Sequence, residues 1–195
     1  MLTLCIDTSY KYLACALIKD KEIIAEYNEE CFKRQSEEVF KAIDSLFKKS
    51  GYDQADIDSI ALSIGPGSYT GVRIGLTIGK VISTLKNIDL YKISTLKLYS
   101  NNLPNTMVML NARSNRAYVG VYDEGKCLLN DQVIEVDKID SKDYQVIGDG
   151  SLINKEDKMF KISECFLNNF DYLEKVEDKH HLVPVYLKES EAYLK

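Results

Sequence analysis

The residue types that build metal sites and disulfide frameworks are scarce or scattered in this sequence of 195 residues. Its two histidines, His180 and His181, are adjacent, so they would point in different directions on any regular element, and no cluster of other ligands accompanies them. We therefore predict no metal site. The five cysteines are odd in number and include no Cys-x-x-Cys pair, which indicates thiols in a reducing cytosol rather than a disulfide framework.

Long apolar runs and an excess of positive charge are also missing. No segment approaches the roughly 20 uninterrupted apolar residues of a membrane span. The apolar run at the N-terminus has no basic leader and is interrupted by Asp7, so we expect a cytoplasmic protein without membrane association. The net charge of −5 is not the basic field by which proteins hold a nucleic-acid backbone unaided. The pairs Lys33-Arg34 and Lys48-Lys49 are short and typical of solvated helix ends, so any RNA would be held mainly by a partner.

Hydrophobic periodicity predicts a unit of three strands, a helix, a strand and a second helix. The first helix has Ser36 as its N-cap and Gly51 as its C-cap. The strands are predicted at 2–6, 12–18, 22–27 and 59–64, and the second helix at about 71–85. The same order starts again with strands near 108–114, 117–122, 126–129 with 133–136, and 144–147, and with a helix at 163–173.

This repeat predicts an α/β fold of two lobes, residues 1–102 and 103–195. Duplicated strand-strand-strand-helix-strand-helix lobes are the layout of the actin-like ATPase (ribonuclease H-like) superfamily.

A glycine-rich turn between the fourth strand and the second helix is the most informative segment. Glycines there permit positive φ and close approach of the backbone, and a helix N-terminus suits an anion. The turn is neither a Walker A loop nor a dinucleotide fingerprint. It therefore has two open interpretations, an anion or nucleotide contact and a sharp turn that binds nothing. Asp7 likewise has two, a magnesium ligand and a turn cap. The candidate contacts are Asp7, Thr8, Ser9, Gly65, Gly67, Ser68, Gly71 and Arg73.

The helix after this turn carries glycine at every fourth position, from Gly71 through Gly75 to Gly79. Each interior glycine costs about 1 kcal/mol relative to alanine, so close packing of another backbone along that face is expected. The remaining sides are largely apolar and must be covered, by the rest of the chain or by a partner protein. The predicted partner interface comprises Val39, Phe40, Ile43, Phe47, Val72, Gly75, Leu76, Gly79 and Val81. Gly75→Leu is expected to abolish partner binding and leave the isolated fold largely intact.

Five landmarks resemble the TsaB (YeaZ) family, in the family's order and over nearly the whole chain. They are IDTS at 6–9, GPGSYTGVRIG at 65–75, STL at 94–96, NAR at 111–113 and PVYL at 184–187. The resemblance implies an actin-like fold and heterodimerisation with the catalytic paralogue TsaD, alongside the ATPase TsaE. The implied role is that of a non-catalytic subunit in transfer of threonylcarbamoyl to adenosine 37 of tRNAs reading ANN codons. No cofactor is expected in the isolated chain, because ATP/Mg and a metal belong to the partner subunits and tRNA is bound through the complex.

Two residues depart from what the family pattern leads us to expect. Asn111 stands where many relatives are expected to have aspartate, and Gln35 stands where the family often has histidine before serine. The chain is also short for the family, so a trimmed second lobe is expected. Two alternatives remain: an actin-like ATP-binding phosphotransferase or hydrolase acting on its own through Asp7 and the glycine turn, and a homodimer through the same helix face. The sequence contains no metal-binding histidine pair, no Gly-x-Ser-x-Gly motif and no Cys/His nucleophile, so it gives no support for a protease.

Overall fold

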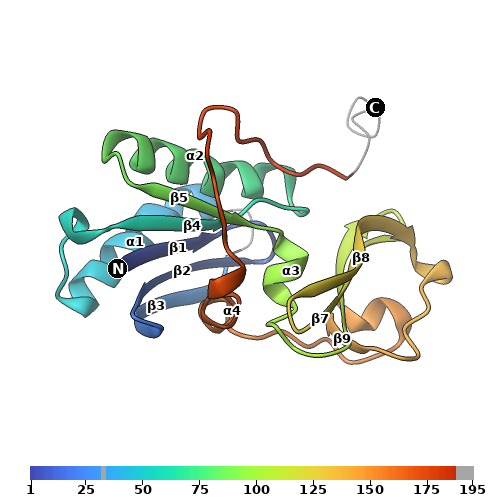
Figure 1. Cartoon of the computed structure of the whole chain (residues 1–195). Helices are drawn as coiled ribbons and strands as arrows, with labels where there is room; N and C mark the ends of the chain where they lie inside the picture. The colour runs from blue at the N-terminus through green and yellow to red at the C-terminus, as the bar shows by residue number, and fades with distance from the viewer. Residues whose placement is uncertain (32–33, 188–195) are drawn as a thin grey trace.

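The computed structural model describes residues 1–31 and 34–187, which form two sheets with helices packed on the first (Figure 1). The first sheet has the strand order β10-β5-β4-β1-β2-β3. Strands β1, β2 and β3 are antiparallel neighbours, whereas β4 runs parallel to β1 and β5 parallel to β4. Their bounds are β1 Leu2–Asp7, β2 Tyr12–Lys19, β3 Glu22–Glu30, β4 Ser59–Ser63, β5 Asp89–Ile93 and β10 Glu174–Lys175.

Helices cover both faces of the first sheet, which is why all six residues of β1 are buried. Leu4 and Ile6 share a core with α1 (Gln35–Ser50) and α2 (Tyr69–Leu85). Cys5, which points the other way, packs with α3 (Thr95–Tyr99) and α4 (Ile162–Asn168). None of the helices within the described residues is long and apolar enough to cross a membrane.

The first helix begins two residues earlier than predicted. Its N-cap is Arg34, no side chain caps it, and Ser36 lies inside the first turn. The C-terminal end is as predicted, because Gly51 takes the left-handed conformation at φ 74° and its N–H donates to Phe47 O.

The second sheet, of order β8-β7-β6-β9, repeats the β3-β2-β1-β4 part of the first but lacks counterparts of α1 and α2. Strands β6 (Thr106–Arg113), β7 (Arg116–Asp123) and β8 (Lys126–Glu135) are antiparallel, and β9 (Gln145–Gly148) runs parallel to β6. Where the first lobe has α1 and α2, the second has single 3₁₀ turns at Val136–Lys138 and Gly150–Ile153. The second lobe is thus shorter than the first, as expected of a trimmed lobe, and the helix that packs against its sheet is α3 from the first half of the chain.

The chain then returns to the first lobe. The helix predicted at 163–173 is the shorter α4 with a 3₁₀ turn at Phe170–Tyr172, and it packs on the first sheet. Residues 174–187, here called the C-terminal strap, pair with β5 through β10 and continue beside α2 (Figure 1). The division at 102 and 103 thus stays a prediction, and residues 188–195 of the second predicted lobe lie outside the described part.

Residues of β3 anchor the start of α4, and Glu26 provides a test of that anchor. Its carboxylate accepts from Ser163 Oγ at 2.5 Å and pairs with Lys161 Nζ at 2.6 Å, and these contacts lower the pKa of Glu26, with the Lys161 contribution the larger. A carboxyl whose pKa is lowered on folding stabilises the folded state at pH values above its unfolded pKa of about 4.3. This stabilisation is lost as the pH falls through the folded pKa. Glu26→Gln should therefore cost about 1 kcal/mol at pH 7 and much less at pH 3, measured by urea denaturation.

Glu22→Gln on the same strand is the control, because Glu22 is exposed. An equal loss for Glu26→Gln at both pH values would contradict a contribution from the ionised carboxylate.

Candidate functional site

The glycine turn between β4 and α2 is occupied by backbone from two other segments of the chain. A Cβ added at three of its glycines would overlap a backbone oxygen, at Gly65 with Val185 O (2.7 Å), at Gly67 with Ser9 O (2.2 Å) and at Gly71 with Thr8 O (2.1 Å). The first contact comes from the C-terminal strap and the other two from the loop after β1. Close packing within the chain therefore accounts for these glycines.

The polar groups of the first turn of α2 also have internal partners. Ser68 Oγ accepts from Gly71 N at 3.2 Å, and Ser68 N donates to Ser9 O at 2.7 Å. Thr8 Oγ1 donates to Gly71 O at 2.7 Å and accepts from Gly75 N at 3.0 Å. Of the candidate anion contacts, Thr8, Ser9, Ser68 and Gly71 are thus brought together and bonded to one another, whereas Gly65 N donates to Thr95 Oγ1 at 3.1 Å. The anion or nucleotide contact itself stays a prediction.

Asp7 is fully buried at the end of β1 and is surrounded by donors. It accepts from Ser9 N at 3.1 Å and Ser9 Oγ at 2.5 Å, from Ser63 Oγ, and from Tyr99 OH at 2.7 Å. Burial, with the neighbouring Asp7 as a second cause, raises the pKa of Tyr99, so the phenol remains a donor. These contacts favour the role of a turn cap for Asp7 over that of a magnesium ligand.

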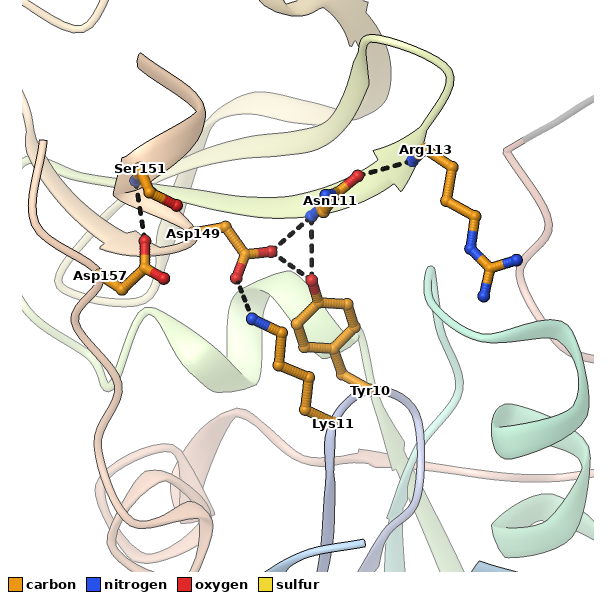
Figure 2. A network of polar contacts seen from close by, with 7 residues as sticks. All are labelled: Tyr10, Lys11, Asn111, Arg113, Asp149, Ser151 and Asp157. Atoms are coloured by element: carbon orange, nitrogen blue, oxygen red, sulfur yellow. Dashed lines mark hydrogen bonds and ion pairs between the residues drawn. The ribbon is translucent and has the colours of Figure 1, made fainter. Parts of the chain in front are cut away.

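A polar cluster joins the two lobes beside this loop (Figure 2). Asp149, which follows β9, has a side chain only 6% exposed. It accepts from Tyr10 OH, from Lys11 Nζ at 2.6 Å and from Asn111 N at 2.7 Å. Burial, followed by the bond to Asp149, raises the pKa of Tyr10. Burial lowers the pKa of Lys11, but its pairing with Asp149 outweighs that effect and the net change is upward.

This interlobe cluster was not predicted from the sequence, because its members lie far apart along the chain. The Asn111 side chain does not take part in it: its Oδ1 accepts from Arg113 N at 2.7 Å within the β6–β7 hairpin. The cluster pairs a lysine with a carboxylate and so holds the lobes together. No group of three or more His, Cys, Asp or Glu in residues 1–31 and 34–187 is placed to hold a metal ion.

The glycine face of α2 turns inward, against the chain's own sheet. A Cβ at Gly75 would lie 2.9 Å from Thr8 Oγ1, and one at Gly79 would lie 2.2 Å from Leu62 Cδ2. The expectation that Gly75→Leu would leave the fold intact is therefore wrong. The buried members of the predicted interface serve the chain's own interior, namely Val39, Ile43, Phe47, Val72, Gly75, Leu76 and Gly79.

The opposite face of α2 is exposed, and with Phe40 it forms the candidate interface. Phe40 is 64% exposed and Val81 50%, so contact with a partner stays a prediction for these two members of the original set. Five exposed positions of α2 recur every fourth residue, two places out of phase with the glycines, and Thr70 and Thr84 are exposed beside them. We call these five the outer stripe, which comprises Tyr69, Arg73, Thr77, Val81 and Leu85. Tyr69, Thr77 and Leu85 were missed, although this spacing was present in the sequence.

A groove of about 410 Å³ runs between α1 and the outer stripe. Its lining is mostly apolar or neutral and comprises Ser36, Val39, Phe40, Tyr69, Thr70, Arg73, Ile74, Thr77 and Ile78. Phe40 and Tyr69 stand exposed at its rim, whereas Val39 is fully buried at its floor. Such a groove bounded by exposed aromatic side chains suits an apolar helix of another protein.

Two sheets of repeated strand order, the first covered by helices on both faces, define an actin-like (ribonuclease H-like) α/β protein, as predicted. Residues 12–179 match the family model described as TsaD: tRNA N6-adenosine threonylcarbamoyltransferase. YeaZ from Pseudomonas aeruginosa superposes with a TM-score of 0.79 at 18% identity, over 95% of this chain and 99% of that one.

Curated relatives named TsaB also match the chain. The chain is 33% identical over 138 residues to tRNA threonylcarbamoyladenosine biosynthesis protein TsaB of Bacillus subtilis, a match that covers 69% of this chain and 60% of that protein. It is 26% identical over 178 residues to TsaB of Buchnera aphidicola subsp. Schizaphis graminum, covering 83% of this chain and 84% of that protein. The chain belongs to the TsaB (YeaZ) family.

Proposed function

We propose that this chain is the non-catalytic subunit that pairs with TsaD in threonylcarbamoyl transfer to adenosine 37 of tRNAs reading ANN codons. The names of the TsaB relatives, which are threonylcarbamoyladenosine biosynthesis proteins, support the pathway. In this assignment TsaE and tRNA join through the complex, and ATP/Mg and the metal are held by the partner subunits. The accessory role is consistent with a cytoplasmic protein of net charge −5 that leaves most of the RNA contact to others.

The observation that carries the proposal is the exposed outer stripe with its groove and its large apolar side chains. Phe40, Val81 and Leu85 are 64%, 50% and 81% exposed on neighbouring helices. Large exposed apolar side chains gathered on one face are typical of protein interfaces. In contrast, the carboxylate with which an actin-like enzyme would contact a nucleotide is already engaged within the chain. Asp7 accepts hydrogen bonds from four donor atoms of its own lobe. This favours partner binding over independent ATP chemistry.

Reconstitution of the tRNA modification from purified components tests the proposal. We expect product only when this chain is present with the TsaD- and TsaE-type proteins, and none from the chain alone. Val81→Asp should lower product formation at least about tenfold by placing a charge in the interface. Leu128→Asp is the matched control, because Leu128 is 47% exposed, much like Val81 at 50%, but lies on β8 of the other lobe. Product formation that is indifferent to the chain, or turnover by the chain alone, would reject the accessory role.

A further inference from the structure

Arg73 is the charged member of the outer stripe and occupies a fixed position in it. Among the described residues that line the groove it is the one with a charged side chain. Its guanidinium lies over the Tyr69 ring at 5.3 Å, and Nη1 donates to Tyr69 OH at 3.1 Å. Tyr69 in turn stacks on Tyr186 of the C-terminal strap, with ring centroids 4.9 Å apart and 24° between the planes. These contacts order the guanidinium before any partner arrives.

Docking on the outer stripe would bury this positive charge. Arginine cannot lose its proton in a protein, so desolvation cannot be avoided by neutralisation. Within the part of the chain that the structure describes, no carboxylate forms an ion pair with Arg73. A partner that brought only apolar groups would leave an unpaired buried charge, which strongly disfavours binding. A planar guanidinium is best matched by a carboxylate, which it can bind through two parallel hydrogen bonds.

The charges of the helices favour a different protein over a second copy of this chain. Helix α2, from Tyr69 to Leu85, contains no aspartate or glutamate. Two copies meeting α2 to α2 would bring both guanidiniums together without a carboxylate from either stripe. On α1, Glu38 is paired with Lys41 at 3.1 Å and Asp44 with Lys48 at 2.6 Å, whereas the exposed Glu37 forms no ion pair with a described residue. An α2-to-α2 contact between two copies therefore supplies no compensating acid, and we take another protein as its source.

We infer that the partner presents an apolar helical surface with one aspartate or glutamate placed opposite Arg73, and that this ion pair selects the partner and its register. The inference rests on the proposed function in taking a TsaD-type paralogue as that partner. It adds that Arg73 distinguishes this partner from apolar surfaces without the acid, because electrostatic complementarity governs specificity more than contact area does.

The test measures binding of the purified TsaD-type paralogue of the same organism by calorimetry. Arg73→Met keeps the apolar stem and removes the charge, and we expect at least about 30-fold weaker binding because the partner's carboxylate is left unpaired. Arg73→Glu should weaken binding further, and reversing the partner's carboxylate to arginine should restore it. Lys126→Met is the control, since Lys126 is exposed on β8 and the variant changes the net charge equally. Arg73 is exposed, so its variants should melt like the wild type.

The outcomes separate this inference from the proposed function. Weak binding by both Arg73 variants, with rescue by the reversed partner, supports the inference. If Val81→Asp abolishes binding but Arg73→Met binds like the wild type, the carboxylate inference fails and the docking surface stands. If Val81→Asp and both Arg73 variants bind like the wild type, or the wild type pairs only with itself, the docking surface and the inference both fail.

Discussion

Gly71→Ala is expected to lower the free energy of unfolding by at least about 3 kcal/mol, although alanine is the better helix former. The gain in helix propensity is at most about 1 kcal/mol. Against it stands a Cβ that would lie 2.1 Å from Thr8 O, a backbone atom that can yield only if β1 and its loop move. Overpacking of this kind costs about 1–3 kcal/mol and more where the neighbour is rigid. Because total stability is about 5–15 kcal/mol, the change should be plain in urea denaturation followed by circular dichroism.

Two variants of the same helix calibrate the result. Gly75→Ala should cost less than Gly71→Ala, because its Cβ would lie 2.9 Å from Thr8 Oγ1, a side-chain atom that can rotate. Thr77→Ala on the outer stripe should be neutral or slightly stabilising, since Thr77 is exposed and alanine has the higher helix propensity. Wild-type stability in Gly71→Ala would mean that the turn and the β1 loop are not in close contact. The glycine turn would then need another explanation, such as a ligand.

The elements of the first lobe up to α2 could be predicted because their signals are local, whereas β5 and α3 were missed. The alternating strands, the glycine after α1 and the periodicity of α2 are each set by a few neighbouring residues. The glycines of α2 also predicted a close backbone approach, which is correct at Gly71 but wrong at Gly75 and Gly79, where side chains pack instead. Which segment approaches could not be predicted from the helix alone, since its own sheet and a partner are equally able to pack on Gly75 and Gly79. The structure decides for the sheet and so places the exposed stripe on the other side.

The second lobe and the interlobe cluster depend on contacts between distant residues. Nothing local to α4 indicates that it returns to the first sheet, where its first N–H donates to Asn28 Oδ1 at 2.9 Å. Likewise, Lys11 and Asp149 are separated by 138 residues, and only the folded chain brings them together. Asp7 was a candidate from its position at the end of β1, but its capping role required knowledge of Ser63 and Tyr99 as donors.

Asp149→Ala is expected to destabilise the protein by about 2–3 kcal/mol, mainly by releasing the two lobes from each other. The substitution leaves the Lys11 ammonium and Tyr10 hydroxyl without their acceptor and removes one from Asn111 N. Breaking a buried ion pair costs about 3–5 kcal/mol. We expect less than this cost because the Lys11 side chain is 36% exposed and regains some hydration when Asp149 is removed. Asp149→Asn, which keeps the shape and an acceptor oxygen, should cost less.

Asp171→Ala provides the matched comparison, because Asp171 also pairs with a lysine far away in the sequence. Lys21 Nζ lies 2.9 Å from Asp171, but the two side chains are 68% and 72% exposed, so water screens the pair and we expect a change within about 0.5 kcal/mol. Hydrogen exchange separates a local loss from a release of the lobes: Asp149→Ala should speed exchange at Asn111 N and along β6 and β9 more than along β1 and β4. Uniform acceleration in both sheets would instead mean that Asp149 stabilises the whole fold without acting as a link between lobes. Equal effects of the two alanine variants would show that burial gives the Lys11–Asp149 pair no advantage.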